Sequence, residues 1–289
     1  MATRTHTNLW SIAMGIKSPD NCAMTVSPGR ARIERAQELS NQHAFASEIL
    51  GFFIPVARFQ IEMREQLGST NLRTSLSGGV DSELSREELS EFSSRFASFL
   101  SVVEANGPPQ LAQQSRALRA RGKDSWAELL SGAWIACSPS GAEGVLAQAF
   151  LQPYAQLLRS DASPLPAIHT YAVCPFCNRK PVVGVLRQMG DGGARSLVCG
   201  FCLNEWHFRR IVCPGCGEEN DRKLPVFTAT DFDYIRVDCC DSCKTYIKTV
   251  DLTMNGHADP IVDEIASAPL DLWARDRGYA KLQKNLLGM

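Results

Sequence analysis

The chain has 289 residues, of which 44% are hydrophobic and 21% charged, and its formal net charge is −1. This composition is typical of a globular protein, long enough for one large domain or for two to three small ones. With so small a net charge, no strong electrostatic attraction to nucleic acid or to a membrane surface is expected.

The N-terminal segment, residues 1–28, shows no clear hydrophobic periodicity and is expected to be loose. It lacks the continuous apolar segment of a secretory signal peptide, and no run in the chain approaches the roughly 18 apolar residues of a membrane span. The Arg209–Arg210 pair lies too deep in the chain to act as a twin-arginine signal. We therefore expect a cytoplasmic protein, in a reducing compartment.

Residues 29–160 show the spacing of amphipathic helices and predict a bundle of five or six of them. A short helix is expected at 30–40. The apolar positions from Phe45 to Leu67 then step by three or four residues, in a helix that Pro55 should kink or split. A loop rich in Ser, Thr and Gly is expected at 68–81. Core packing explains the apolar stripes better than a partner groove does.

Three capping-box patterns predict helix starts within this bundle, because a Ser side chain and a Glu three residues later can satisfy each other's backbone amides. They are Ser85 with Glu88, Ser125 with Glu128, and Ser140 with Glu143. A Pro-containing linker is expected at 161–170. Beyond it the pattern changes to short β-prone runs separated by Gly, Pro and Cys, which predicts strands.

Nine of the eleven cysteines lie between residues 174 and 243. In a reducing compartment, closely spaced cysteines are metal ligands or redox dithiols more often than disulfide partners. Eight of them form four Cys-x-x-Cys pairs: Cys174/Cys177, Cys199/Cys202, Cys213/Cys216 and Cys240/Cys243. Two thiolates at this spacing can grip one ion in a tight turn. A residue with positive φ is expected after such a turn, as Gly217 in CPGCG indicates.

The segments between the pairs read as hairpins, and the order pair, hairpin, pair, strand occurs twice. Cys213 follows Cys174 by 39 residues, and Cys240 follows Cys199 by 41. This repeat predicts two tandem metal ribbons, at 171–212 and 213–252. Of the three possible groupings of four pairs, hairpin geometry favours the sequential one. A helical tail with acidic character is expected at 253–289.

The predicted fold class is therefore α+β: an N-terminal helical bundle, two tandem rubredoxin-like or zinc-ribbon units, and a C-terminal helical tail. Four thiolates in a tetrahedron suit zinc or a mononuclear rubredoxin-like iron equally well. Either shell is closed and leaves no position for a substrate, which argues against metal-dependent hydrolysis. Cys22, Cys137 and Cys239 are interpreted as bystanders, and His207 as a surface or packing residue.

The four pairs, CPFC, CGFC, CPGC and CDSC, resemble in their order those of the formate dehydrogenase accessory protein (FdhE) family. The run EWHFRRIVCPGC at 205–216 and the acidic ending at 259–279 are also similar to that family. The resemblance covers roughly residues 30–289 and is specific in the cysteine-rich half. Cys239, which stands directly before Cys240 and makes the run CCDSC, departs from the single-cysteine pattern expected of the family, and this leaves its role open.

The resemblance implies a cytoplasmic protein, without a turnover reaction of its own, that is needed for active respiratory formate dehydrogenase. Such proteins bind the catalytic subunit of that enzyme before export. They hold iron through the paired cysteines in a rubredoxin-like manner, and some hold zinc. Carried over by position, the metal ligands are the eight paired cysteines: Cys174, Cys177, Cys199, Cys202, Cys213, Cys216, Cys240 and Cys243.

Two other functions compete with this interpretation. A nucleic-acid-binding zinc ribbon needs a basic surface for phosphates, but residues 171–252 hold eleven basic and ten acidic side chains, and a zinc tetrathiolate adds negative charge. A thiol-redox or sulfur-transfer enzyme usually places its Cys-x-x-Cys at a helix N-terminus, whereas these pairs are predicted at strand ends. Both alternatives are disfavoured, and the oligomeric state is not indicated.

Overall fold

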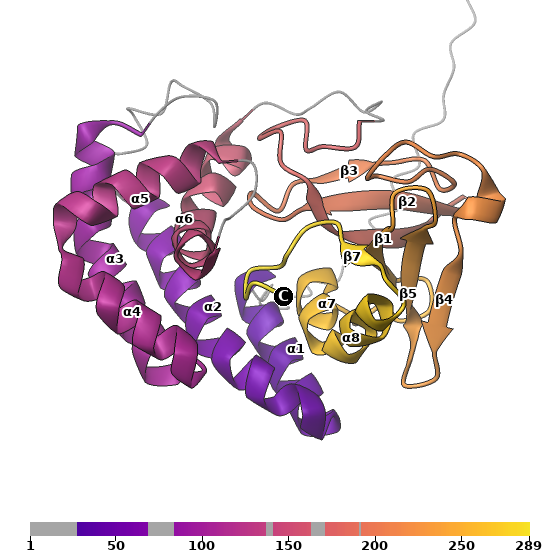
Figure 1. The fold of residues 1–289 in the computed structure, drawn as a ribbon, viewed down its shortest axis with the longest axis horizontal. Helices are drawn as coiled ribbons and strands as arrows, with labels where there is room; N and C mark the ends of the chain where they lie inside the picture. The colour runs from indigo at the N-terminus through magenta and orange to yellow at the C-terminus, as the bar shows by residue number, and fades with distance from the viewer. Residues whose placement is uncertain (1–27, 69–83, 137–140, 163–170, 191) are drawn as a thin grey trace, which may run out of the picture.

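The computed structural model describes residues 28–68, 84–136, 141–162, 171–190 and 192–289, and it divides into a helical half and a sheet half (Figure 1). The helices of the first half are α1 (Pro28–Gln42), α2 (Ser47–Gly68), α3 (Arg86–Asn106), α4 (Pro109–Arg121), α5 (Lys123–Ile135) and α6 (Gly141–Asp161). The mixed helix and sheet architecture, with helices first, confirms the predicted fold class.

Local signals in the helical half are partly confirmed. Ser85 and Glu88 form the predicted capping box at the start of α3. The prediction at Ser125 was wrong: α5 begins at Lys123, because Gly122 with φ of 83° turns the chain between α4 and α5, and Ser125 lies inside the helix. Helix α2 continues through Pro55 and is not split. The predicted loop at 68–81 and the cap at Ser140 lie almost wholly outside the described residues, as do residues 1–27 and most of the 161–170 linker.

Aromatic side chains form the centre of the helical half. Phe92, Phe96 and Phe99 of α3 are fully buried and pack with Phe150 of α6. They recur every three or four residues, so one face of α3 is continuously apolar. The predicted core function of this stripe is confirmed.

A sheet of seven strands occupies the second half of the described chain. Its strands are β1 (Pro181–Met189), β2 (Gly192–Cys199), β3 (Glu205–His207), β4 (Val226–Ala229), β5 (Phe232–Cys240), β6 (Thr245–Asp251) and β7 (Ala280–Lys281). The order is β3-β2-β1-β6-β5-β4, with β7 beside β6. The predicted hairpins are β1–β2 and β4–β5, both antiparallel.

The two hairpin units are joined into one sheet by a parallel pairing of β1 with β6. Gly184 lies opposite Thr249 at this joint. A Cβ at position 184 would lie 2.3 Å from the Thr249 hydroxyl oxygen, so glycine is the residue that allows this approach. The repeat in the sequence predicts two ribbons but not this direct connection between them.

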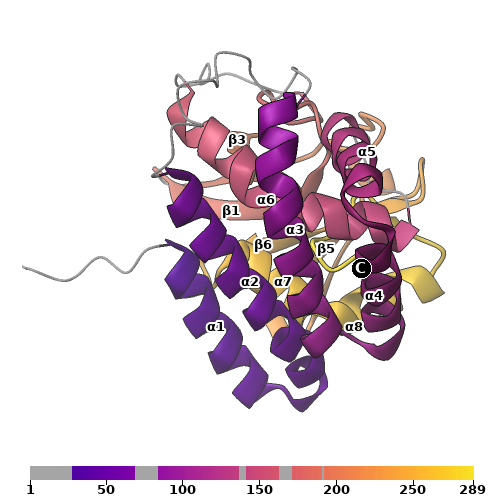
Figure 2. The same cartoon turned by 90° about the vertical axis from the view of Figure 1, so that its left-hand side faces the viewer.

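The C-terminal tail lies between the helical half and the sheet (Figures 1 and 2). It contains helices α7 (Pro260–Ala266) and α8 (Ala268–Asp276), as the sequence predicts. Asp259 caps α7 by accepting from the amides of Ile261 and Val262. The apolar side chains of α7 pack with β1, β5 and β6 in a second core, which also contains residues of α1 and α2. The tail therefore binds the two halves together.

Helix α1 is held to the tail by buried charge. Arg35 forms two hydrogen bonds with Asp263, from Nη2 to Oδ1 at 2.7 Å and from Nε to Oδ2 at 3.1 Å. The Asp263 side chain is fully buried, and the Tyr234 hydroxyl of β5 also donates to it at 2.8 Å. Arg35 and Asp263 are 228 positions apart in the sequence, so local pattern reasoning cannot detect their contact.

One segment of the described chain, Ala44–Gly68, is long and apolar enough to cross a membrane by length and composition. The sequence analysis predicted no run of this kind, and Ala44–Gly68 is an exception to that prediction. Leu50, Phe53, Val56 and Met63 of this segment are buried in the two cores. A core helix passes the same test of length and composition.

Candidate metal centres

Each Cys-x-x-Cys pair forms the same tight turn, here called a knuckle. The residue after the second cysteine has positive φ in all four knuckles: 54° at Asn178, 56° at Leu203, 78° at Gly217 and 55° at Lys244. In three of them the amide of that residue donates to the carbonyl of the first cysteine at 2.9 Å. The prediction made at Gly217 is confirmed, and it extends to three non-glycine residues, where this conformation is uncommon.

Backbone amides point at the first sulfur of three knuckles. The amides of Phe176, Phe201 and Gly215 lie 3.4, 3.3 and 3.2 Å from the Sγ atoms of Cys174, Cys199 and Cys213. Such donors disperse the negative charge of a thiolate and stabilise it as a ligand. At position 215 a Cβ would lie 3.4 Å from two cysteine sulfurs and 2.8 Å from the Thr245 hydroxyl, so a side chain would crowd the centre.

The eight paired cysteines come together as two clusters of four. The first cluster is Cys174, Cys177, Cys199 and Cys202, and the second is Cys213, Cys216, Cys240 and Cys243. Within each, the sulfur atoms lie within 4.8 Å of one another. This is the sequential grouping that hairpin spacing predicts.

The sulfur geometry fits a tetrahedral ion. Neighbouring Sγ atoms are 3.3 to 3.6 Å apart in the first cluster and 3.7 Å apart in the second. A tetrahedron with metal–sulfur bonds of about 2.3 Å has edges of about 3.8 Å. Both clusters could therefore hold a metal ion. Zinc and iron both accept four thiolates, so the donor set does not distinguish them.

The first cluster is enclosed by protein. All four of its cysteines are buried, and they belong to the same hydrophobic core as the helical half. Phe201, inside the second knuckle, packs against Trp134 of α5 with ring centroids 5.6 Å apart. The first centre thus forms part of the main core.

Arg179 fastens this cluster to the helical half. It follows the first knuckle, is 4% exposed, and lies with its guanidinium carbon 3.4 Å from the centre of the Phe201 ring. Its Nη2 donates to the carbonyls of Ala133 and Trp134 at 2.9 and 2.6 Å, at the end of α5. A cation at a helix C-terminus is favourable. Sequence reasoning missed this residue, since its partners are distant in the chain.

The second cluster is more open. Cys216 is exposed and Cys243 is half-buried, whereas Cys213 and Cys240 are buried. No cysteine of this cluster belongs to either hydrophobic core of the described residues. The second centre therefore depends on its own hairpin and on β6 rather than on the helices.

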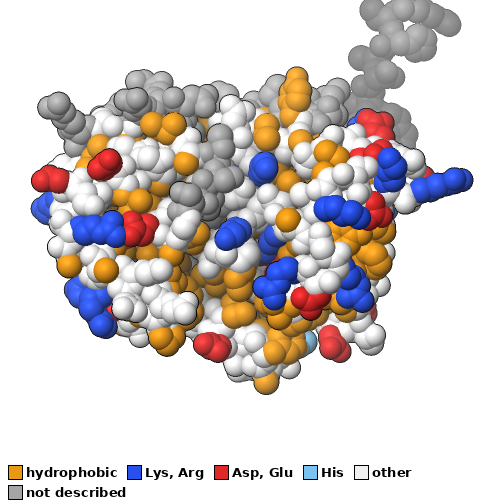
Figure 3. Space-filling view, in the orientation of Figure 1, with side chains coloured by type: hydrophobic (Ala, Val, Ile, Leu, Met, Phe, Trp, Pro, Cys, Tyr) orange, Lys and Arg blue, Asp and Glu red, His pale blue; other side chains and the backbone are white. Residues whose placement is uncertain are grey.

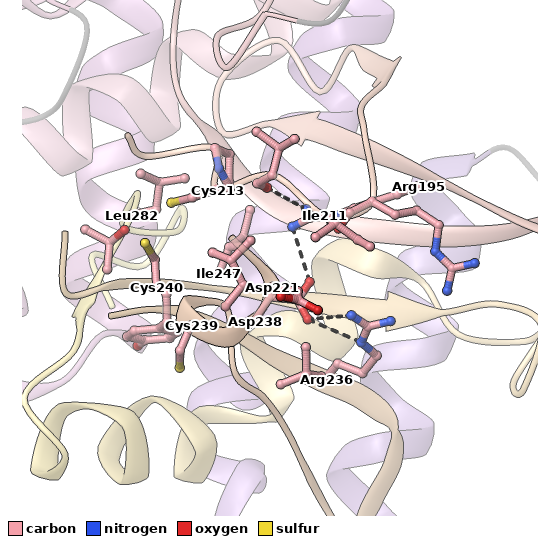
Figure 4. Close-up of a pocket in the computed structure, with 17 residues that line it drawn as sticks. Arg195, Ile211, Cys213, Asp221, Arg236, Asp238, Cys239, Cys240, Ile247 and Leu282 are labelled. Atoms are coloured by element: carbon pink, nitrogen blue, oxygen red, sulfur yellow. Dashed lines mark hydrogen bonds and ion pairs between the residues drawn. The ribbon is translucent and has the colours of Figure 1, made fainter. Parts of the chain in front are cut away.

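A cavity of about 400 Å³ adjoins the second cluster and is lined partly by Cys213 and Cys240 (Figure 4). Arg195 crosses it: Nη1 donates to the carbonyl of Val212 at 3.2 Å, and Nη2 lies 3.2 Å from Asp238. Arg236 also pairs with Asp238, at 2.9 Å. Burial lowers the pKa of Arg195, opposed by Asp238. Arg195 thus holds the segment that connects the two metal units.

The remaining cysteines and the histidine lie outside the clusters. Cys239 is buried on β5, and its neighbour Cys240 is the ligand candidate. Burial, with the charges of Asp238 and Asp241, raises the pKa of the Cys239 thiol to about 12. His207 is exposed, in line with its interpretation as a surface or packing residue, while its neighbours Trp206 and Phe208 are buried. Cys22 and Cys137 lie outside the described residues.

Sequence models of known domains match the cysteine-rich half. Residues 173–210 match "FdhE, central domain" and residues 211–287 match "FdhE, C-terminal domain". The Protein FdhE homolog of Aquifex aeolicus is 29% identical over 259 residues, which cover 84% of this chain and 87% of that protein. The chain is thus similar to FdhE proteins over most of its length.

Other FdhE proteins match over shorter spans or in structure. The Protein FdhE homolog of Pseudomonas aeruginosa is 35% identical over 123 residues, about two fifths of each chain (40% and 39%). The crystal structure of the FdhE protein from Pseudomonas aeruginosa is similar in fold, with a TM-score of 0.61 and 22% identity. That match covers 90% of this chain and 95% of that one. The similarity in fold therefore extends over the helical half as well as the sheet half.

Proposed function

We propose that this protein is a cytoplasmic accessory factor that makes a respiratory formate dehydrogenase active. It binds the catalytic subunit of that enzyme before export and catalyses no turnover reaction itself. Similarity to FdhE proteins over most of the chain carries this proposal. Two clusters of four cysteines that could each hold an ion support it, since closed thiolate shells suit a folded binding surface better than substrate chemistry.

In this proposal the eight paired cysteines are the ligands of two mononuclear ions. Iron is favoured and zinc is possible. Cys174, Cys177, Cys199 and Cys202 would hold one ion between residues 171 and 212, and Cys213, Cys216, Cys240 and Cys243 the other between 213 and 252. An iron ion would supply one-electron redox chemistry, whereas zinc would supply only folding free energy.

The surface of the sheet half suits a partner of mixed character. On the face shown in Figure 3, exposed hydrophobic side chains lie between lysine and arginine side chains. Ile211 and Val226, at the cavity beside the second centre, are among the exposed large hydrophobic residues. Apolar side chains with arginine are enriched at protein interfaces. This composition is compatible with docking of an unfinished enzyme subunit.

The experiment combines genetic complementation with co-purification. A strain lacking the gene is complemented with the wild-type chain, with Cys216→Ser, or with Cys239→Ser as a matched control outside the clusters. We expect formate dehydrogenase activity with the wild type and Cys239→Ser only. The tagged wild-type chain should retain the catalytic subunit. Full activity in the deletion strain, or no retention of the subunit, would refute the proposal.

The identity of the ions is tested by anaerobic purification, elemental analysis and a visible spectrum. Two iron ions per chain, with thiolate-to-iron charge-transfer bands, are expected. Two zinc ions and a colourless protein would leave the accessory function standing and remove the redox role. A chain without metal, with eight readily titrated thiols, would contradict the ligand assignment.

A further inference from the structure

The two metal units repeat one pattern, so matching positions around their cysteines can be compared. Each knuckle is followed, two places after its second cysteine, by a residue here called the closing residue: Arg179, Asn204, Glu218 or Thr245. In the first three knuckles its carbonyl accepts a hydrogen bond of 2.8 to 2.9 Å from the amide of the first cysteine. In the fourth, Thr245 pairs with Cys240 between β6 and β5. The closing residue therefore has a similar place in all four knuckles, while its side chain differs.

Three of the four closing side chains make their contacts away from the sulfur atoms. Arg179 donates to carbonyls of α5, Asn204 accepts from an arginine of α6, and Glu218 accepts from a serine hydroxyl. Thr245 differs, because its Oγ1 lies 3.0 Å from the Sγ atom of Cys243. Among the described residues, Thr245 is the only residue other than a cysteine whose side chain forms a hydrogen bond with a sulfur of either cluster.

The Thr245 hydroxyl is the donor in this contact. A cysteine that binds a metal ion is a thiolate, which has no proton and can only accept. Thr245 is the first residue of β6 and lies between Cys240 of β5 and Ala280 of β7. Its branched side chain has few rotamers. The strands on both sides therefore hold the donor at the sulfur.

The facing knuckle leaves room for this hydroxyl. A Cβ at Gly215 would lie 2.8 Å from Oγ1 of Thr245 and 3.4 Å from Sγ of Cys243. In the repeat, Phe176 takes the position of Gly215 in the first unit, and Asn204 takes the position of Thr245. The second centre thus combines a glycine with a hydroxyl donor, and the first centre has neither. The two differences fit each other, since the glycine gives the hydroxyl access to the sulfur.

The sulfur that accepts this hydrogen bond is partly accessible. Cys243 is half-buried, whereas all four cysteines of the first cluster are buried. A hydrogen bond to a thiolate disperses its negative charge, orients it and stabilises it as a ligand. The first centre is enclosed by the main core instead. The hydroxyl therefore supports a ligand that packing alone does not enclose.

We propose that Thr245 is a positioning residue of the second metal centre, whose hydroxyl stabilises the Cys243 thiolate and so helps to retain the ion. This role depends on the ligand set proposed above for that centre. It makes the two centres chemically different, because only the second has a side-chain donor to a sulfur among the described residues. Loss of the hydrogen-bond partner of a metal ligand lowers metal affinity about ten- to hundredfold.

The experiment is a chelator competition that follows both ions of the full, metal-loaded chain. We compare the wild type with Thr245→Val, which removes the donor and keeps the branched shape, and with Thr245→Ser, which keeps a hydroxyl. The matched control is Thr228→Val, at an exposed position of β4 outside both clusters. Loading with cobalt(II) gives a second readout, because its thiolate charge-transfer band depends on the electron density of the sulfur. Thermal unfolding establishes that each variant is folded.

We expect Thr245→Val to bind one of its two ions about ten- to hundredfold more weakly and to shift the cobalt band to lower energy. Thr245→Ser and Thr228→Val should match the wild type in both measurements. Equal affinities and spectra in the wild type and Thr245→Val would overturn the role of Thr245 and leave the ligand assignment intact. A loss that Thr245→Ser does not restore would assign the effect to packing and overturn it too. A wild-type chain that binds no ion at the second cluster would refute the ligand assignment itself.

Discussion

The two cysteine clusters have the same local structure in different surroundings. Both are built from knuckles with a positive-φ residue after the second cysteine. The first is buried in the main core and fastened to α5 by Arg179, whereas the second has an exposed ligand, Cys216, and adjoins a cavity. Local sequence therefore determines whether a cluster forms. Tertiary packing determines how much of the protein is destabilised when that cluster is lost. The first centre is expected to be structural for the whole protein, and the second to be the accessible one.

The largest expected effect is the difference between Cys199→Ser and Cys216→Ser. Each should lose one ion, which contributes on the order of 10 kcal/mol to the folding of a small metal unit. With Cys199→Ser the helical half should lose its cooperative unfolding, because this cluster belongs to its core. With Cys216→Ser the helices should melt as in the wild type. Metal analysis and thermal unfolding followed by circular dichroism measure both, and identical melting of the two variants would break the comparison.

The next effect concerns the buried ion pairs between Lys248 of β6, in the second metal unit, and the C-terminal tail. Lys248 of β6 is fully buried and lies 3.1 Å from Glu264 and 2.8 Å from Asp271. Removing one partner of a buried ion pair costs about 3 to 5 kcal/mol. We therefore expect Glu264→Gln to lower the free energy of unfolding at pH 7 by about this amount, as measured by urea titration.

The pH dependence of this difference provides its control. Burial alone would raise the pKa of Glu264, but Lys248 and Lys281 outweigh it and lower the pKa to about 2, from an ordinary value of 4.5. Its stabilising effect is complete above pH 4.5 and is lost as the pH falls toward 2. The gap between wild type and Glu264→Gln should narrow over that window. Metal release at low pH affects both proteins equally. A difference in unfolding free energy that stays constant with pH would therefore come from packing rather than from the charge of Glu264.

A smaller effect is expected at Arg179, which connects the first cluster to the end of α5. Lysine keeps the charge but cannot reproduce several hydrogen bonds and the stacking on Phe201. Arg179→Lys should therefore cost about 2 kcal/mol of unfolding free energy, the value of a charged hydrogen bond. As a control, Arg209→Lys, at an exposed pair with Glu219, should leave stability unchanged. Equal losses of unfolding free energy in the two variants would show that the contacts of Arg179 with α5 and Phe201 contribute no particular stability.

The last effect is expected at the joint between the two units. Gly184→Ala places a Cβ against the Thr249 hydroxyl and should cost about 1 to 3 kcal/mol, as overpacking does. Thr249→Ala removes that oxygen and its hydrogen bond to Asp238, at about 1 kcal/mol. The double variant should be more stable than the sum of the two losses predicts. Strictly additive changes in unfolding free energy, measured by denaturant titration, would show that residues 184 and 249 do not interact.

Sequence reasoning succeeded where structure is local. The hairpins, the knuckle turns and the cap at Ser85 depend on a few neighbouring residues, and the structure contains them. The cap at Ser125 failed because Gly122 allows a tighter connection that the capping pattern does not register. The β1–β6 joint and the contacts of Arg179 involve residues far apart in sequence, which no periodicity encodes. The domain boundaries expected from composition remain a prediction.

The pairing of Arg35 with Asp263 has a consequence for how the protein is made. A ribosome releases α1 early, but the carboxylate that receives its buried guanidinium is synthesised more than two hundred residues later. Until then Arg35 of α1 lacks its partner, and the apolar side chains of α1 that join α7 in the second core are exposed to water. Contacts so distant in sequence form late and slowly. Completion of this fold therefore waits until α7 has been synthesised and can pack against α1.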